Sequence, residues 1–114
     1  MVDVKGTTIT ITRGDSGAIL VKIYNDDKTE YVPVEGDTVR FALKKNYTDA
    51  EPLLVKDIPI STMELILSPE DTKNLECGPV RGKYKYDIEL VREQGTWVDT
   101  FIPRADFLVL EEVL

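Results

Sequence analysis

Apolar and polar residues alternate along most of the chain, so that every second side chain is hydrophobic. The alternation is clearest in segments 38–45 and 82–92. The residues on the apolar faces of these two segments are Val39, Phe41, Leu43, Tyr84, Tyr86, Ile88 and Leu90. A period of two residues is typical of β-strands that are buried on one face. We therefore expect these seven side chains to form the centre of the hydrophobic core.

Shorter alternating segments are separated by turns rich in Gly, Pro, Asn and Asp. The further strands expected are residues 7–12, 18–24, 31–34, 53–57, 63–68, 96–102 and 105–113. Pro33 restricts its strand to the edge of a sheet, since proline cannot donate a ladder hydrogen bond, and Pro103 with Arg104 should interrupt the chain between the last two strands. Short strands in this number, with regularly spaced turns, favour an antiparallel β-sandwich with Greek-key connections.

The pattern changes once, at the sequence Ser-Pro-Glu-Asp of residues 68–71. A serine at the N-cap, a proline at the first helical position and an acid at the third are typical of the start of a helix. Because Gly78 and Pro79 follow, the helix should end after about one or two turns, near Leu75. The pattern thus predicts an all-β protein with one short helical turn, forming a single domain over residues 1–114.

The composition supports this prediction and excludes several classes of protein. The chain has 114 residues, of which 42% are hydrophobic and 31% charged, which suits one domain with one core. A single cysteine cannot form an internal disulfide, and the absence of histidine excludes catalytic and metal sites that depend on this residue. The formal net charge is −7 and the sequence shows no basic stripe, so we expect no binding to nucleic acid.

The amino terminus lacks the apolar segment and the cleavage site of a signal peptide. No segment approaches the roughly 20 apolar residues that are needed to cross a bilayer. We therefore expect no association with a membrane, and synthesis in the cytoplasm of the producing cell.

Residues 13–15, Arg-Gly-Asp, spell the tripeptide that integrins recognise. Integrin recognition would need this segment displayed on a protruding loop of an extracellular protein. In a tight turn between two strands, by contrast, glycine supplies a positive φ and aspartate accepts backbone hydrogen bonds. Because the sequence carries no secretion signal, the turn is the favoured interpretation.

Acidic residues offer oxygen atoms that could bind Ca²⁺ or catalyse glycoside hydrolysis. The candidate groups are Asp26 with Asp27, Glu35 with Asp37, and Glu70 with Asp71. None has the spacing of a calcium-binding loop, and most acids alternate with apolar residues or occupy turns. Cys77 lacks a histidine or a second cysteine to activate it and has Glu76 as its neighbour, so we expect a loop residue. We predict a non-catalytic protein with no catalytic residue, no bound metal and no cofactor.

Two sets of residues could form a binding surface. An aromatic platform for a sugar could be built from Trp97, Tyr24, Tyr31 and Tyr47. A tryptophan in a hairpin strand, however, more often packs against its neighbours. The second set consists of apolar residues on strand faces that a lone sandwich would make polar, namely Leu20, Leu54, Ile66, Val91 and Leu108. These residues predict contact with a protein partner, unless a sheet edge or a long loop covers them.

Two stretches together resemble a known family. A Gly-Asp turn at residues 12–16 follows the first strand, and a Pro-Glu-Asp-Thr turn at 69–72 precedes the segment Gly-Lys-Tyr-Lys-Tyr-Asp-Ile at 82–88. Over residues 7–113 the chain resembles the immunoglobulin-like modules of bacteriophage and prophage baseplates. It is similar to the amino-terminal domain of the upper baseplate protein family of phages that infect Gram-positive bacteria. Residues 77–81 are an insertion relative to that family.

The resemblance implies an immunoglobulin-like sandwich in which Tyr84 forms a tyrosine corner, with its hydroxyl group bonded to the backbone within residues 70–78. Tyr86 stands where antibody domains have their second cysteine. The implied function is that of a non-catalytic structural or interaction module in the tail tip or baseplate of a phage or prophage particle. Such a module would reside in the virion, after assembly in the bacterial cytoplasm, and would bind protein partners, either itself or other virion components. The alternative is a cell-surface adhesin or a carbohydrate-binding immunoglobulin-like module from a larger secreted protein.

Overall fold

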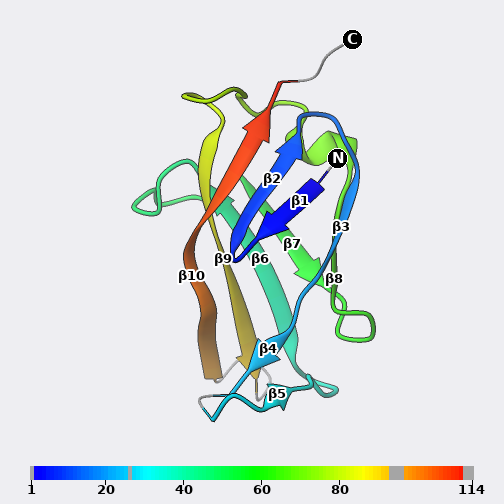
Figure 1. Ribbon diagram of the computed structural model, residues 1–114. Coiled ribbons are helices and arrows are strands. Elements are labelled where there is room, and N and C mark those ends of the chain that lie inside the picture. Colours follow the sequence, from blue (N-terminus) through cyan, green and yellow to red (C-terminus); the bar gives the residue numbers. More distant parts are fainter. Residues whose placement is uncertain (1, 26, 93–96, 112–114) are drawn as a thin grey trace.

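The computed structural model describes residues 2–25, 27–92 and 97–111. In these residues, ten strands and one helical turn make up the regular structure (Figure 1). The strands are β1 (Val2–Lys5), β2 (Thr8–Thr12), β3 (Gly17–Leu20), β4 (Ile23–Tyr24), β5 (Glu30–Tyr31), β6 (Thr38–Lys44), β7 (Leu54–Ile58), β8 (Glu64–Leu67), β9 (Lys83–Arg92) and β10 (Trp97–Leu110). The helix is α1 (Pro69–Thr72). This content confirms the prediction of an all-β protein with one short helical turn.

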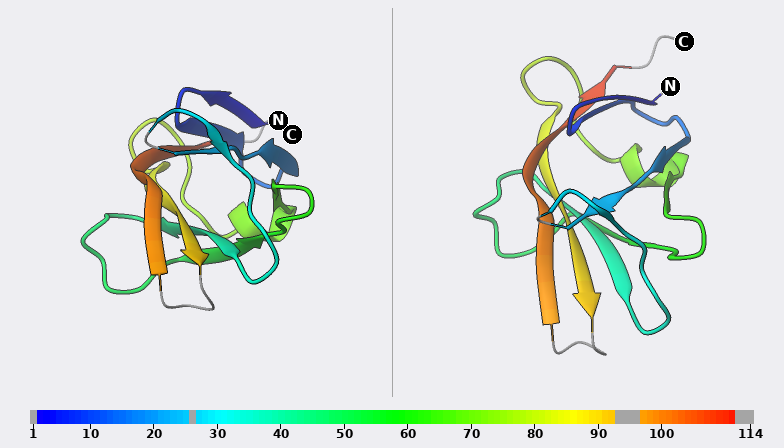
Figure 2. Two further views of the ribbon diagram at one scale, coloured as in Figure 1. Left: turned by 90° about the horizontal axis from the view of Figure 1, so that it is seen from below. Right: turned by 60° about the horizontal axis from the view of Figure 1, so that its bottom comes forward.

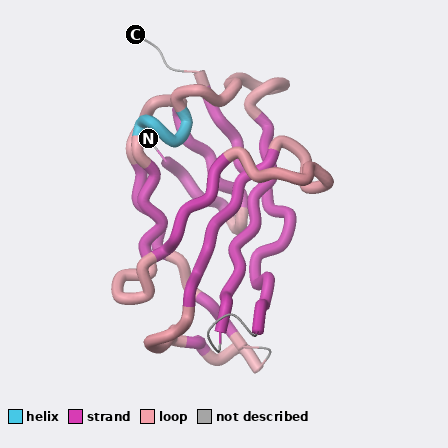
Figure 3. Tube along the Cα trace, turned by 180° about the vertical axis from the view of Figure 1, so that it is seen from behind, coloured by secondary structure: helices cyan, strands magenta, loops and turns pink. Residues whose placement is uncertain are grey.

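The strands form two layers around one interior, as the view from below shows (Figure 2). The larger sheet has the order β1-β2-β10-β9-β6-β7, and its strands lie side by side in the view from behind (Figure 3). β3 and β8 pair in a second sheet, and β4 and β5 form a short ribbon at one end of the molecule. All pairs between the described strands are antiparallel except that of β2 with β10. The sandwich is confirmed, whereas the immunoglobulin-like Greek key stays a prediction.

The core lies between the two sheets and is built mainly from alternate residues of β6, β9 and β10. All seven side chains predicted to form it are buried. In the register of β6 and β9, Leu43 is opposite Tyr86 and Phe41 is opposite Ile88, so these side chains share one face of the sheet. Three aromatic rings pack together in the core. The Phe41 ring centroid lies 5.4 Å from that of Tyr86 and 6.0 Å from that of Phe107. The centroids of Tyr86 and Phe107 are 6.3 Å apart. The strands β2 and β8 add Ile9, Ile11, Leu65 and Leu67.

The amino-terminal segment forms a strand that the sequence pattern did not indicate. β1 pairs with β2 in a hairpin, with Val2 opposite Ile11 and Val4 opposite Ile9. The two strands turn at Gly6, whose φ of 61° glycine adopts without strain. Because β1 contains only two apolar residues, its alternation is too short to be distinguished from that of a loop.

Two predicted strands are shorter than expected, for reasons of pairing. Segment 18–24 is divided into β3 and β4, because β3 pairs with β8 whereas β4 pairs with β5. Segment 31–34 contributes only its first residue, Tyr31, to β5, since the partner strand β4 has just two residues. The turn expected at 93–95 lies outside the described residues.

The interruption predicted at Pro103 and Arg104 is wrong. β10 continues from Trp97 to Leu110 and accommodates both residues in an irregular section of its pairing with β9. A β-bulge allows a proline to remain in a strand, since a residue that is not paired needs no ladder hydrogen bond. The irregularity therefore replaces the strand break.

Tyr84 forms the corner contact expected from its position. Its ring is buried, and its hydroxyl group accepts a hydrogen bond of 2.8 Å from the Glu76 backbone N–H. Glu76 lies in the connection between α1 and β9, within the predicted range 70–78. Burial raises the pKa of the Tyr84 phenol above its ordinary value, because it disfavours the charged form. The contact fixes this connection to the start of β9.

Replacement of Leu43 by alanine should destabilise the protein by about 2–5 kcal/mol, because a fully buried side chain leaves a cavity that its neighbours fill only in part. Urea unfolding, followed by circular dichroism, would measure the loss. Val55→Ala is the control, since Val55 lies on the neighbouring strand β7 and is 47% exposed; it should cost less than about 1 kcal/mol. Equal losses in the two variants would contradict the position of Leu43 at the centre of the core.

Tyr84→Phe should destabilise the protein by about 0.5–1.5 kcal/mol, the usual net contribution of one hydrogen bond. The ring stays in place, whereas the Glu76 N–H loses its acceptor. The midpoint of urea unfolding would report the change. Tyr24→Phe, at an exposed tyrosine of β4, serves as the control, and a Tyr84→Phe midpoint equal to that of the wild type would refute the corner contact.

Candidate functional site

The Arg-Gly-Asp segment of residues 13–15 forms a tight turn that is held by α1. Gly14 adopts a φ of 84°, and its N–H donates a hydrogen bond of 2.9 Å to the hydroxyl group of the buried Thr72. The Arg13 side chain reaches back to the Leu75 carbonyl oxygen, at 3.5 Å. The predicted turn is therefore confirmed, and its arginine lies along the protein instead of protruding.

Among the three predicted groups of acids, Glu70 with Asp71 lies at the helical turn. The Asp71 carboxylate accepts hydrogen bonds of 2.8 Å from the Ser68 N–H and from the Lys56 ammonium group, so it joins β7 to α1. The Asp71 side chain is 11% exposed. Partial burial raises the pKa of Asp71, but the bonds from Lys56 and Ser68 outweigh this effect and hold the pKa below its ordinary value. Asp71 is therefore a structural anchor.

Two other predicted acids are also engaged by donors of the protein itself. The Asp37 carboxylate accepts hydrogen bonds from the Tyr31 hydroxyl group at 2.6 Å and from a backbone N–H at 3.0 Å. Asp27 accepts from both the N–H and the hydroxyl group of Thr29, while Asp26 lies outside the described residues. Within residues 2–25, 27–92 and 97–111, no three or more His, Cys, Asp or Glu side chains form a cluster suited to a metal ion.

Cys77 lies in the loop after α1, as predicted. Its thiol is free. The side chain is half-buried and packs against the core, which gives the residue a place in the packing of the loop.

The structure does not bring the predicted aromatic platform together. Tyr31 is opposite the buried Ile23 in the β4–β5 ribbon, so the exposed Tyr24 points to the other face of that ribbon. Tyr47 belongs to the loop between β6 and β7, which lies away from the ribbon (Figure 1). The side chain of Trp97 lies outside the described part of the structure.

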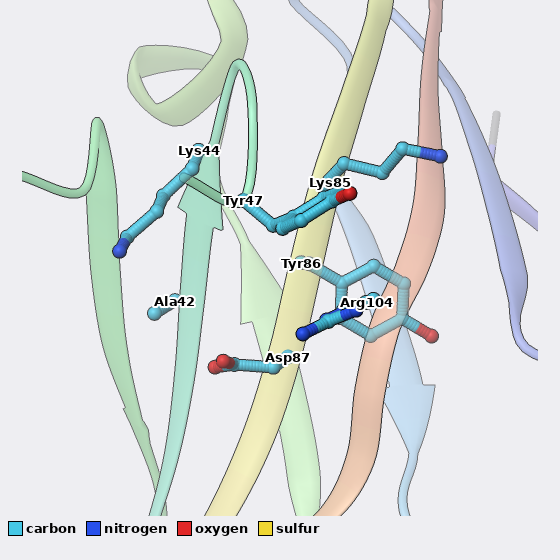
Figure 4. Close-up of a pocket in the computed structure, with 7 residues that line it drawn as sticks. All are labelled: Ala42, Lys44, Tyr47, Lys85, Tyr86, Asp87 and Arg104. Carbon is cyan, nitrogen blue, oxygen red and sulfur yellow. The ribbon is translucent and has the colours of Figure 1, made fainter. Parts of the chain in front are cut away.

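Tyr47 instead covers a small pocket on the outer face of the larger sheet (Figure 4). The pocket, called the outer-face pocket below, is lined by Ala42, Lys44, Tyr47, Lys85, Tyr86, Asp87 and Arg104. The Arg104 guanidinium group lies over the Tyr47 ring, 4.6 Å from its centroid, in a cation–π contact. Sequence analysis missed this pair, because the two residues are far apart in the chain and neither belongs to a recognisable motif.

The floor of the outer-face pocket follows from the register of β6 and β9. Ala42 is opposite Asp87, and Lys44 is opposite Lys85. The ammonium groups of the two lysines point away from each other (Figure 4). That of Lys44 donates to a carbonyl oxygen of the β6–β7 loop at 2.7 Å, and that of Lys85 pairs with Asp106. The aliphatic stems of the lysines and the small Ala42 therefore form the floor.

Arg104 reaches the pocket from a bulge in β10. The pairing with β9 contains an extra residue at this point, so that Pro103 and Arg104 together oppose Asp87. Arg104 has a φ of 50°, in the left-handed region that residues other than glycine seldom adopt. The bulge sets the arginine beside Asp87 on the outer face. The Pro-Arg step of residues 103–104 indicates an irregularity in the sequence, but it does not reveal a bulge or the face on which Arg104 lies.

Apolar side chains are exposed on the outer face of the smaller sheet, as predicted for Leu20 and Ile66. Leu20 is 63% exposed and Ile66 is 51% exposed. Ala18 is exposed and lies opposite Ile66 in the register of β3 and β8. We call Ala18, Leu20 and Ile66 the β3–β8 face. Val91 and Leu108 are half-buried on the outer face of the larger sheet.

The outer-face prediction for Leu54 is wrong. Leu54 is opposite the buried Leu43 in the register of β6 and β7, and it packs against the core. The next residue on the same face of β7 is Lys56, which bonds to Asp71. Because the inner face of β7 carries this lysine, hydrophobicity alone did not reveal which face is buried.

β3 has a free edge beside the β3–β8 face. The Val21 N–H donates to the Met63 carbonyl oxygen at 2.8 Å, so the odd-numbered residues of β3 bond to β8. The N–H and C=O groups of Ala18 and Leu20 therefore point away from β8. No other described strand pairs with β3 on that side.

An apolar groove lies next to this edge, between β3 and the turn of the β1–β2 hairpin. It is lined by Val4, Gly6, Thr7, Ile9, Ile19, Leu20, Val21, Lys22, Leu65, Tyr86 and Ile88. Among the described residues of this lining, Lys22 is the one that carries a charge. β1 and β3 are in contact at Gly17, where a Cβ atom would lie 2.8 Å from a Val2 methyl carbon. The groove therefore lies beyond this contact, toward Lys22.

Comparison with known proteins adds no relative. No protein family, curated protein or solved structure matches the chain. In the described residues, no helix has the length and apolar character needed to cross a membrane. The resemblance to phage baseplate modules thus stays a prediction.

Asp71→Asn should destabilise the protein by about 1–3 kcal/mol at neutral pH, because the Lys56 ammonium group then faces a neutral amide in place of a charged carboxylate. Folding lowers the pKa of Asp71, so its stabilisation is fully present above the ordinary aspartate pKa of about 3.9 and is lost as the pH falls through the lower, folded-state value.

Urea unfolding between about pH 7 and pH 2 would test the sign of this effect. The difference in stability between the wild type and Asp71→Asn should shrink below about pH 4. Asp57→Asn, at an aspartate of β7 that is 76% exposed, is the control and should show little difference at any pH. A constant Asp71→Asn difference over the whole range would contradict the role of the charge.

Proposed function

We propose that the chain is a non-catalytic structural or interaction module of a phage or prophage particle, at the tail tip or baseplate, that binds other proteins through its smaller sheet. The observation that supports protein binding is the β3–β8 face next to an unpaired strand edge. The face of a sheet that points away from the core is normally polar. Because Leu20 and Ile66 are exposed on this face, their burial by a partner would be favourable.

The free edge of β3 suggests how a partner would bind. Unpaired N–H and C=O groups of an edge strand can bond to an incoming strand, and proteins usually protect such edges with proline, charge or a covering segment. The edge groups here belong to the uncharged residues Ala18 and Leu20. An extended segment of a partner would add to the sheet through main-chain hydrogen bonds, and the apolar groove would receive its side chains.

Other features are in keeping with this role. Asp37 and Asp71 are engaged by protein donors, which makes them poor candidates for a pair of catalytic carboxylates. The net charge of −7 favours a protein partner over nucleic acid. The phage setting, with assembly in the bacterial cytoplasm, rests on the sequence resemblance, and the contacts of Gly14, Thr72 and Tyr84 give its motifs a structural role.

The alternative is a cell-surface adhesin or a carbohydrate-binding module from a larger secreted protein. One observation favours it. In the outer-face pocket, the exposed Tyr47 ring lies near Arg104 and Asp87, and an aromatic ring with a few polar groups suits a small polar ligand.

Sedimentation velocity at increasing concentration, and capture of purified virion tail proteins on the immobilised chain, would test the proposal. Ile66→Lys should weaken association by about tenfold or more, because it removes an apolar contact and adds a charge to the β3–β8 face. Ala18→Pro removes an N–H that points outward and should also weaken binding, while the pairing of β3 with β8 is kept.

Val55→Lys is the matched control, since Val55 is exposed to a similar degree on the outer face of the other sheet. A loss in Val55→Lys equal to that in Ile66→Lys would mean that the β3–β8 face is not the binding surface. A chain that stays monomeric, captures no virion protein and retains a glycan on an array would favour the carbohydrate-binding alternative.

A further inference from the structure

We propose that the outer-face pocket binds an oxyanion group, either a carboxylate or a phosphate, on a hydroxylated molecule such as a sugar acid or a sugar phosphate. The pocket lies on the larger sheet, whereas the proposed protein-binding surface belongs to the smaller sheet. The two proposals are therefore independent and can fail separately.

The Arg104 guanidinium group supplies the main donors. Its five N–H groups form a planar fork that matches the geometry of carboxylate and phosphate. Within the described parts of the chain, Arg104 contacts the Tyr47 ring and has neither an ion-pair partner nor a hydrogen-bond acceptor. The contact with the ring involves no N–H acceptor and therefore leaves the N–H donors for a ligand. A fork held in this way is ready for an oxyanion.

The backbone of Arg104 indicates that its placement has a cost. A φ of 50° is unfavourable for any residue with a Cβ atom, and such outliers gather at binding sites. Glycine would take this conformation without strain. An arginine that is kept in a strained bulge, with its charge unpaired by the protein, points to a role in binding a ligand.

The charges around the outer-face pocket favour an anion. The Lys85 ammonium group pairs with Asp106, whereas that of Lys44 donates to a loop carbonyl oxygen and has no carboxylate partner among the described residues. With Arg104, three cations line the pocket together with one carboxylate, that of Asp87, although the chain as a whole carries a net charge of −7. A bound oxyanion would be attracted by the positive charges of Arg104 and Lys44.

Asp87 narrows the class of ligand. An ionised carboxylate can only accept hydrogen bonds, so beside a bound oxyanion it requires a donor from the ligand. The small side chain of Ala42, directly opposite Asp87, leaves room for such a group. A hydroxyl group on the ligand would meet this need, whereas inorganic phosphate would engage the cations alone.

Titration calorimetry of the whole chain with glucuronate, glucose 6-phosphate, glucose and inorganic phosphate would test the proposal. At least one charged sugar should bind. Stronger binding of glucuronate would indicate a carboxylate ligand, and stronger binding of glucose 6-phosphate would indicate a phosphate ligand. Inorganic phosphate and glucose should each bind at least about tenfold more weakly than the preferred charged sugar. Absence of binding by both charged sugars, or equal binding of glucose or of inorganic phosphate, would overturn the proposal.

Arg104→Gly separates binding from folding. Because glycine relieves the backbone strain, this variant should unfold at the same temperature as the wild type or at a higher one. Its affinity for the preferred charged sugar should fall by about tenfold or more. Arg104→Lys keeps the charge but loses the planar fork, so it should lose nearly as much affinity.

Lys83→Ala is the matched control, since it removes a positive charge from the outer face of β9 outside the pocket. Its affinity should stay within about twofold of the wild-type value. An unchanged affinity in Arg104→Gly would overturn the proposal. An equal loss of affinity in Lys83→Ala would also overturn it, because the ligand would then be attracted by the overall positive charge of this face and not by the pocket.

Discussion

The packing of Phe41, Tyr86 and Phe107 in the core is the interaction on which the rest of the structure depends. The three rings come from β6, β9 and β10, which are neighbours in the larger sheet. Because side chains alternate between the two faces of a sheet, a slip by one residue in any of these strands would expose a ring and bury a charge. The same register decides which residues meet on the outer face, such as Lys44 and Lys85. The apolar core therefore determines where the charged pocket forms.

Those parts of the fold that depend on neighbouring residues could be predicted from the sequence. Alternation identified the inner faces of β6 and β9, and local chemistry identified the start of α1 and the turn at Gly14. The corner contact of Tyr84 was expected from the resemblance to immunoglobulin-like modules. Features that depend on a partner strand could not be predicted. β1 is too short to show a pattern, and the face of Leu54 is set by its register with β6.

Of the two candidate sites, one could be predicted from the sequence and the other could not. Leu20 and Ile66 could be identified, because an apolar residue on the polar side of an alternating segment is visible in the sequence itself. The outer-face pocket could not, since it depends on a loop that carries Tyr47 over the sheet and on a bulge that sets Arg104 beneath it. A bulge is a mismatch between two paired strands, so its position is known only when their register is known.

The parallel pairing of β2 with β10 has a mechanical consequence. Thr12 lies next to Leu110, and Val2 is opposite Ile11 at the same end of the sheet. A force that pulls residues 2 and 110 apart would first separate β1 from β2, one hydrogen bond at a time. It would then act on β2 at Thr8 and on β10 at Leu110, in opposite directions along two parallel strands. All hydrogen bonds of this pair would then carry the load together in shear, which resists rupture better than successive opening.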